Sequence, residues 1–130
     1  MASRTPTTAE LAILRALWAN GPSTVREVHT ALAPNRDVAY TTTLKMLQVM
    51  TAKGLTIRET RGQQHLYRAK QPEAQTQRHL VSDLIERAFG GSTAQLVLQA
   101  LATKKASPDE LQEIRRLLAR HDETKETGHD

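Results

Sequence analysis

The spacing of apolar residues changes once in the first half of the chain, and this change limits the folds open to it. Up to about residue 53, apolar residues recur every three or four positions, which places them on one face of an α-helix. From Leu55 to Arg68 the pattern becomes alternating, which is typical of β-strands. Because two strands alone are only marginally stable, this pair must pack against the helices that precede it.

The first two predicted helices are short. One runs from Thr8 to Trp18 and is stopped by Asn20-Gly21-Pro22. The next begins with a capping box, in which Thr24 caps the helix start and Glu27 reaches back to it, and Ala33-Pro34-Asn35 ends it. The apolar faces of the two helices consist of Leu11, Leu14, Leu17, Trp18, Val25, Val28 and Leu32. We expect Trp18 and Tyr67 to pack in the core rather than to stack on bases.

A third helix is predicted from Tyr40 to Lys53, closed by Gly54 at the position after its end. With roughly 100° per residue, the inner side holds Tyr40, Leu44, Leu47 and Thr51, with Met50 at its margin. The outer side holds Thr42, Lys45, Met46, Val49 and Lys53. This outer side carries no acidic residue, which suits a surface that faces phosphates and base edges.

The alternating segment is predicted to form a hairpin with strands at 55–60 and 64–68. Gly62, within the turn at 61–63, supplies the positive φ that the turn requires. Short helices followed by a hairpin are the order of a winged helix-turn-helix. We therefore predict a mainly α fold with a small β-hairpin, in which residues 1–71 form a DNA-binding domain.

Residues 72–120 are predicted to form three further helices. Gly90-Gly91 ends the first. In the last, Ser107 is the cap, Pro108 occupies the first helical position and Glu110 completes the capping box. These helices would make a poor independent globule, so we expect a second copy of the chain to cover their apolar residues. The predicted dimerisation residues are Leu80, Leu84, Phe89, Leu96, Val97, Leu101, Leu111, Ile114 and Leu118. The polar segment 121–130 is expected to be a disordered tail.

Charge and composition restrict the function. Residues 1–70 hold ten Lys and Arg against four Asp and Glu, a net charge of +6, whereas residues 71–130 carry −2. A polyanion would be attracted to the first half. The absence of cysteine excludes disulfides, thiolate metal sites and cysteine nucleophiles. With no membrane-length apolar run and no secretory signal, we expect a cytoplasmic protein.

Neither catalysis nor a cofactor is expected. His29, His65 and His79 are scattered, and no Ser/His/Asp constellation is recognisable, so we do not expect an enzyme. A metal site formed by His121, Asp122, Glu123 and His129 is the alternative to a solvated tail, and we favour the tail.

Candidate DNA contacts lie at three places. On the third helix, the side chains that could reach base edges are Thr41, Thr42, Lys45 and Met46, and Thr43 lies nearer the core flank. The alternative is that the threonine-rich start of this helix serves only for capping. In the hairpin, Arg58, Arg61 and Gln63 could reach phosphates or the minor groove, unless they are merely solvated. At the second helix, Ser23 and Thr24 are placed either to bind phosphate or only to cap.

Five segments, in order and at matching spacing, make the chain resemble the penicillinase-repressor family (BlaI/MecI/CopY) from about Thr8 to Leu118. The segments are Leu17-Trp18-Ala19-Asn20-Gly21-Pro22-Ser23-Thr24-Val25-Arg26-Glu27-Val28, Ala39-Tyr40-Thr41-Thr42-Thr43, Lys53-Gly54-Leu55, Phe89-Gly90-Gly91-Ser92 and Ser107-Pro108-Asp109-Glu110-Leu111. The resemblance implies a cytoplasmic repressor that dimerises through its C-terminal helices and places its third helix in the major groove of a palindromic operator.

The resemblance also implies two modes of induction, and the chain departs from both. In the beta-lactam branch a membrane zinc-protease sensor triggers cleavage of the repressor at an Asn–Phe bond, and the matching position here is Gln99-Ala100. In the copper branch a C-terminal cysteine cluster binds metal, and this chain has no cysteine. Despite these departures, we expect the protein to control beta-lactam resistance or another stress response through a sensor protease. A winged-helix module that binds protein without specific DNA binding is the alternative.

Overall fold

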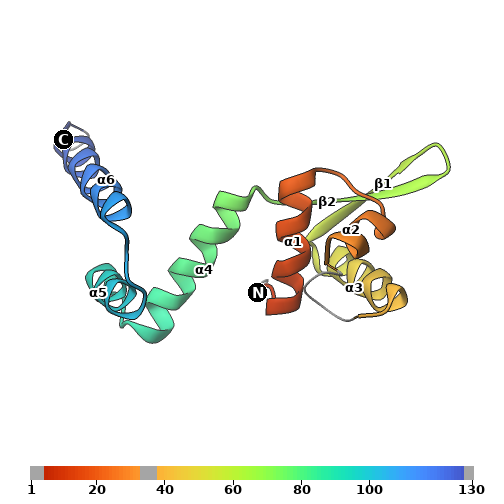
Figure 1. Ribbon diagram of the computed structural model, residues 1–130, viewed down its shortest axis with the longest axis horizontal. Helices are drawn as coiled ribbons and strands as arrows, with labels where there is room; N and C mark the ends of the chain where they lie inside the picture. The colour runs from red at the N-terminus through yellow and green to blue at the C-terminus, as the bar shows by residue number, and fades with distance from the viewer. Residues whose placement is uncertain (1–4, 33–37, 128–130) are drawn as a thin grey trace. The chain divides into compact units, whose positions relative to one another are not determined.

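The computed structural model describes residues 5–32 and 38–127, with side chains up to residue 123 (Figure 1). It divides the chain into an N-terminal unit, residues 1–83, and a C-terminal unit, residues 84–130. The division falls inside helix α4 (Glu73–Ala88), whereas the sequence places a domain boundary after residue 71, where α4 is about to begin.

The first three helices are α1 (Thr8–Asn20), α2 (Val25–Leu32) and α3 (Tyr40–Lys53), and capping residues and a glycine set their limits. A capping box starts α1, because the Thr7 hydroxyl accepts from the Glu10 amide at 3.1 Å and Glu10 accepts from the Thr7 amide at 2.9 Å. The predicted box at Thr24 and Glu27 is confirmed with the same two distances. Gly54, with φ at 86°, is confirmed as the left-handed residue that ends α3.

Strands β1 (Thr56–Arg61) and β2 (Gln64–Ala69) form the predicted antiparallel hairpin, and its tip projects away from α1, α2 and α3 (Figure 1). The register pairs Thr56 with Ala69 and Arg61 with Gln64, and Gly62 has the expected positive φ of 61°. Ser23 pairs with Tyr67 through two backbone hydrogen bonds of 2.8 and 2.9 Å. This bridge ties the base of the hairpin to the connection between α1 and α2.

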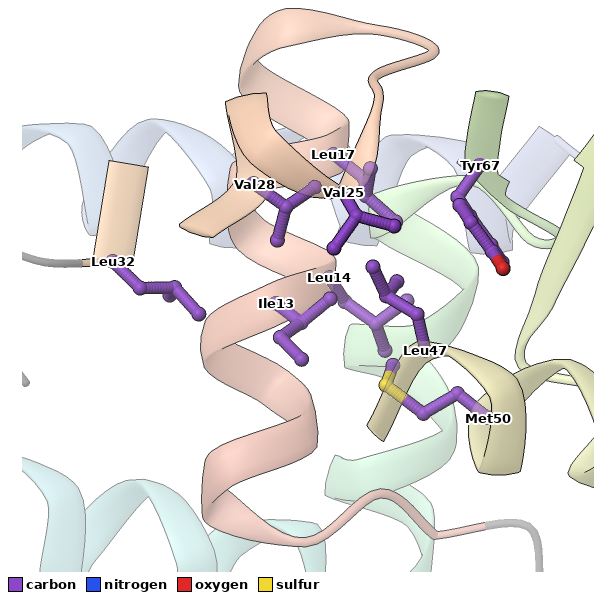
Figure 2. Packing of buried hydrophobic residues seen from close by; sticks show 9 residues of the cluster. All are labelled: Ile13, Leu14, Leu17, Val25, Val28, Leu32, Leu47, Met50 and Tyr67. Atoms are coloured by element: carbon purple, nitrogen blue, oxygen red, sulfur yellow. The ribbon is translucent and has the colours of Figure 1, made fainter. Parts of the chain in front are cut away.

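The core of the N-terminal unit lies between α1, α2, α3 and β2 (Figure 2). It consists of Ile13, Leu14, Leu17, Val25, Val28, Leu32, Leu47, Met50 and Tyr67. Burial of each large side chain of this kind stabilises the fold by about 1.5–3 kcal/mol. The core position of Tyr67 is confirmed, whereas Trp18 is partly buried and packs against the core, with its indole Nε1–H donating to the Gln71 carbonyl at 2.9 Å. Sequence reasoning missed Ile13, which is fully buried.

The remaining helices are α4, α5 (Thr93–Thr103) and α6 (Pro108–Thr127). Gly90 and Gly91, both with positive φ, follow the end of α4, and Ser107 caps α6 by accepting from the Glu110 amide at 3.1 Å, as predicted. The prediction of a disordered tail is wrong for 121–127, because α6 continues to Thr127. Once nucleated, a helix propagates through residues of fair helix propensity, and neither glycine nor proline interrupts this one before Gly128. Residues 128–130 of the predicted tail lie outside the described residues.

The C-terminal helices expose their apolar residues. Among the described residues of α4, α5 and α6, none is buried. Leu84, Leu98 and Leu118 leave 46%, 55% and 61% of their surface accessible. No helix in the described part of the chain is both long and apolar enough to cross a membrane.

Candidate nucleic-acid interface

The exposed side of α3 presents a surface of Thr41, Thr42, Lys45, Gln48 and Val49, which we call the α3 surface. Helix α3 contains no Asp or Glu, so this surface is neutral or positive along its whole length. Thr hydroxyls, a Lys ammonium and a Gln amide are groups that bond base edges or phosphates. Sequence reasoning missed Gln48, although its position one helical turn after Lys45 could have indicated it.

The buried stripe of α3 is rotated from the prediction by about 60°, roughly the angle between residues three positions apart on an α-helix. Thr43, Leu47 and Met50 face the core, whereas Tyr40 remains 37% exposed. Thr43, predicted as a DNA contact, is only 1% exposed, and its Oγ1 lies 3.1 Å from Nδ1 of His29. Its assignment as a DNA contact is therefore corrected: α2 covers it. Met46, placed on the outer side by the helical wheel, is partly buried against the core.

The start of α3 shows that its threonines are not there for capping. Ala39 is the N-cap residue, and within the described part of the chain no side chain caps this helix end. The amides of Thr42 and Thr43 instead donate to the Ala39 carbonyl at 3.0 and 3.2 Å. The threonine side chains at 41 and 42 are exposed and therefore available to a ligand of this surface.

The far end of α3 is held by an ion pair that sequence reasoning missed. Lys53, assigned to the outer side, places its Nζ 2.7 Å from Oε2 of Glu10, a carboxylate that is almost completely buried. Burial alone would raise the pKa of Glu10, but the hydrogen bonds from Lys53 and the Thr7 amide, together with the Lys53 charge, lower it below its ordinary value. Lys53 thus joins α3 to α1, and its ammonium group is occupied by the Glu10 carboxylate.

The arginines of the wing, which is the hairpin of β1 and β2, do not lie side by side. Arg58 and Arg61 are three residues apart on one strand, so their side chains leave opposite faces of the hairpin. The Arg61 side chain is 66% exposed, with its Nη2 3.7 Å from Oε1 of Glu59, and Gln63 is exposed in the turn. The other carboxylate oxygen of Glu59 accepts from Nε of Arg68 at 2.9 Å. The tip of the wing therefore carries Arg61 and Gln63, whereas Arg58 lies nearer its base.

The two candidates before α2 differ in accessibility. Ser23 is 4% exposed, and its hydroxyl donates to the Gly21 carbonyl at 2.8 Å, so its side chain is not presented to a ligand. Thr24 is half-buried, and its hydroxyl already accepts from the Glu27 amide. The structure therefore places both side chains in local roles.

Two further positions lie in the C-terminal unit. Gln99 and Ala100, which match the scissile bond of the beta-lactam branch, are exposed within helix α5. For the proposed tail metal site, the described residues contain no cluster of three or more His, Cys, Asp or Glu side chains that could hold an ion, and His129 lies outside them.

Comparison with known proteins agrees with this architecture. The family described as "Penicillinase repressor" matches residues 6–120. The "Transcriptional regulator BlaI" of Mycobacterium tuberculosis, from strains CDC 1551 and H37Rv, is 32% identical over 111 residues, which cover 85% of this chain and 80% of that protein. The solved structure of a MarR family protein from Bacillus stearothermophilus superimposes with a TM-score of 0.50 at 21% identity, covering 92% of this chain and 76% of that one. The predicted fold class is confirmed, and the chain belongs to the penicillinase-repressor family of winged-helix transcriptional regulators.

Proposed function

We propose that this regulator is a repressor that binds a palindromic operator as a homodimer. The observation that carries the proposal is the α3 surface, which is exposed, free of acidic residues and rich in hydrogen-bonding groups. In the major groove, Thr41, Thr42 and Lys45 would face base edges, because the N-terminal part of a recognition helix points into the groove. Arg61 at the wing tip would contact the phosphate backbone.

The C-terminal helices support a homodimer. Their apolar residues, including Leu84, Val97, Leu101 and Leu118, are exposed in the single chain. So many large apolar side chains left exposed are typical of helices that associate with a partner. Two-fold symmetry of the protein would require two inverted half-sites in the DNA. Their centres would lie one helical turn, about 34–36 Å, or a multiple of it apart.

Induction by proteolysis is the finer part of the proposal. A membrane zinc-protease sensor, as implied by the family resemblance, would lead to cleavage at Gln99-Ala100, in the middle of α5. A cut there would detach α6 and its apolar residues from α4 and so weaken the dimer. The genes released would serve beta-lactam resistance or another stress response.

DNA selected from a random pool by the purified full-length protein tests this function. We expect the enriched sequences to carry two inverted half-sites, and we expect their affinity to fall steeply with salt as counterions are released. Lys45→Ala should lower affinity for the selected DNA by about 1–3 kcal/mol, measured by fluorescence anisotropy. Lys104→Ala, which removes an exposed lysine from the end of α5, is the matched control and should leave affinity unchanged.

Three results would change the proposal. If no sequence is enriched and the protein ignores DNA at moderate salt, the alternative of a protein-binding module replaces it. If the enriched sequences lack two-fold symmetry, the dimeric arrangement is wrong. If Lys45→Ala binds as tightly as the wild type, Lys45 does not contact the operator.

A further inference from the structure

The N-terminal half of α3, which carries the candidate base contacts, is held in place from α2. In the described residues no side chain caps its first turn, so the orientation of that turn depends on packing. The side chains that reach it from α2 are Arg26 and His29, which lie three residues apart and therefore on one face of that helix. Neither residue belongs to the hydrophobic core.

His29 makes the direct contacts. Its Nδ1 lies 3.1 Å from Oγ1 of Thr43, within hydrogen-bond distance of a hydroxyl that is otherwise buried in the core. Its ring also meets the ring of Tyr40 edge to face, with centroids 5.7 Å apart and planes at 80°. His29 thus contacts α3 at two positions, the first residue of the helix and the fourth.

Arg26 also contacts Tyr40. Its guanidinium carbon lies 5.1 Å from the centroid of the Tyr40 ring, a cation–π distance. The exposed Tyr40 side chain therefore lies in contact with two residues of α2. Thr41 and Thr42 lie in sequence between the two anchored residues, Tyr40 and Thr43, so a shift of either anchor would move both of them.

We propose that His29 is a positioning residue that determines operator specificity by holding the first turn of α3, mainly through its hydrogen bond to Thr43. This role rests on the proposed function, because it acts on the side chains that would meet base edges. Base-edge hydrogen bonds require accurate placement, whereas phosphate attraction depends mainly on charge. Loss of His29 should therefore weaken binding to the operator much more than binding to random DNA.

A set of substitutions at position 29 isolates the hydrogen bond. The amide nitrogen of Asn can occupy the place of the histidine Nδ1, whereas the longer Gln places its amide where Nε2 was. Both remove the ring, so His29→Asn and His29→Gln lose the Tyr40 contact equally and differ in the bond to Thr43. Thr30→Ala, which truncates an exposed residue of the same helix, is the matched control.

The first measurement is the ratio of affinities for selected and random DNA. We expect His29→Ala to lower this ratio about tenfold, the size of effect that one disturbed base pair produces, with random-DNA affinity changed less than about twofold. His29→Asn should recover most of the ratio, His29→Gln should recover little of it, and Thr30→Ala should match the wild type. If His29→Ala keeps the wild-type ratio, or if Gln rescues as well as Asn, the bond to Thr43 does not determine specificity.

The second measurement needs no DNA. Amide hydrogen exchange in the full chain should be faster at Thr42, Thr43 and Lys45 in His29→Ala than in Thr30→Ala, whereas exchange at Ile13 and Leu14 should be the same in both. Equal exchange along α3 would overturn the positioning role, and faster exchange everywhere would show a general loss of stability instead. If the wild-type protein does not distinguish selected from random DNA, the proposed function fails, whereas the exchange result still decides whether His29 positions α3.

Discussion

In the N-terminal unit Ile13, Leu47 and Met50 have no accessible surface, whereas in the C-terminal unit Leu98, Leu101 and Leu118 leave 55%, 41% and 61% of theirs exposed. The first unit thus buries its apolar residues within one chain. The second holds helices with good caps but, in its described residues, no buried side chain. Caps define where a helix starts, but packing supplies most of its stability. The N-terminal unit therefore has a core of its own, whereas the described residues of the C-terminal unit have none, as expected if the proposed dimer covers them.

The largest effect should follow from a charge placed among the exposed apolar residues of the C-terminal helices, where it should weaken dimerisation. We expect Leu84→Asp to weaken dimerisation by about 3–5 kcal/mol, because the carboxylate would be buried without a partner. Sedimentation velocity at low micromolar concentration should then show a monomer. Ser82→Asp, at an exposed polar position of the same helix, should remain dimeric. A dimeric Leu84→Asp would place the interface elsewhere.

Next in size is a cavity in the N-terminal core. Leu47→Ala should lower the free energy of unfolding by about 2–5 kcal/mol in urea titrations, because the enclosed site cannot fully collapse. Val49→Ala, an exposed neighbour on α3, should change it by less than about 0.5 kcal/mol. The Leu47→Ala loss should not depend on protein concentration. A loss that disappears at high concentration would mean that the N-terminal unit also depends on the partner.

The ion pair between buried Glu10 and the partly exposed Lys53 should have a smaller, pH-dependent effect on stability. The pKa of Glu10 is lowered in the folded protein, so its contribution is present above the ordinary value of 4.5 and is lost as pH falls through the lowered pKa. Glu10→Gln should cost about 1–2 kcal/mol at pH 7. It should cost less at pH 3, as measured by urea unfolding. Glu59→Gln, in the exposed wing, is the control, and an equal pH dependence in both variants would contradict the assignment.

The smallest effect is expected at the wing. Arg61→Ala should lower affinity for selected and random DNA alike, by roughly two- to fivefold, and reduce the slope of log affinity against log salt by about 1. Anisotropy titrations at several salt concentrations measure both quantities. A loss confined to the selected DNA would show that Arg61 contacts base edges rather than phosphate.

Local signals in the sequence predicted most helix and strand limits. The bounds of α3, the capping boxes at Thr24 and Ser107 and the positive φ of Gly62 were all predicted, because each depends on residues within about four positions of one another. The end of α6 was mispredicted because a polar composition does not stop a helix that has already started. The rotation of α3 by about 60° was also missed, because residues three positions apart, such as Tyr40 and Thr43, differ by only about that angle on a helical wheel.

Apolar spacing, helix caps and glycines are local properties, so the sequence was sufficient to predict the order of elements, the winged-helix fold class and a basic, acid-free third helix. The packing of the elements, in contrast, buries Thr43 and Ser23, pairs Lys53 with Glu10 and brings His29 against Thr43. The Lys53–Glu10 and His29–Thr43 contacts join residues on different elements, and Lys53 and Glu10 are 43 residues apart. Such contacts depend on how the elements pack, which no short stretch of sequence specifies.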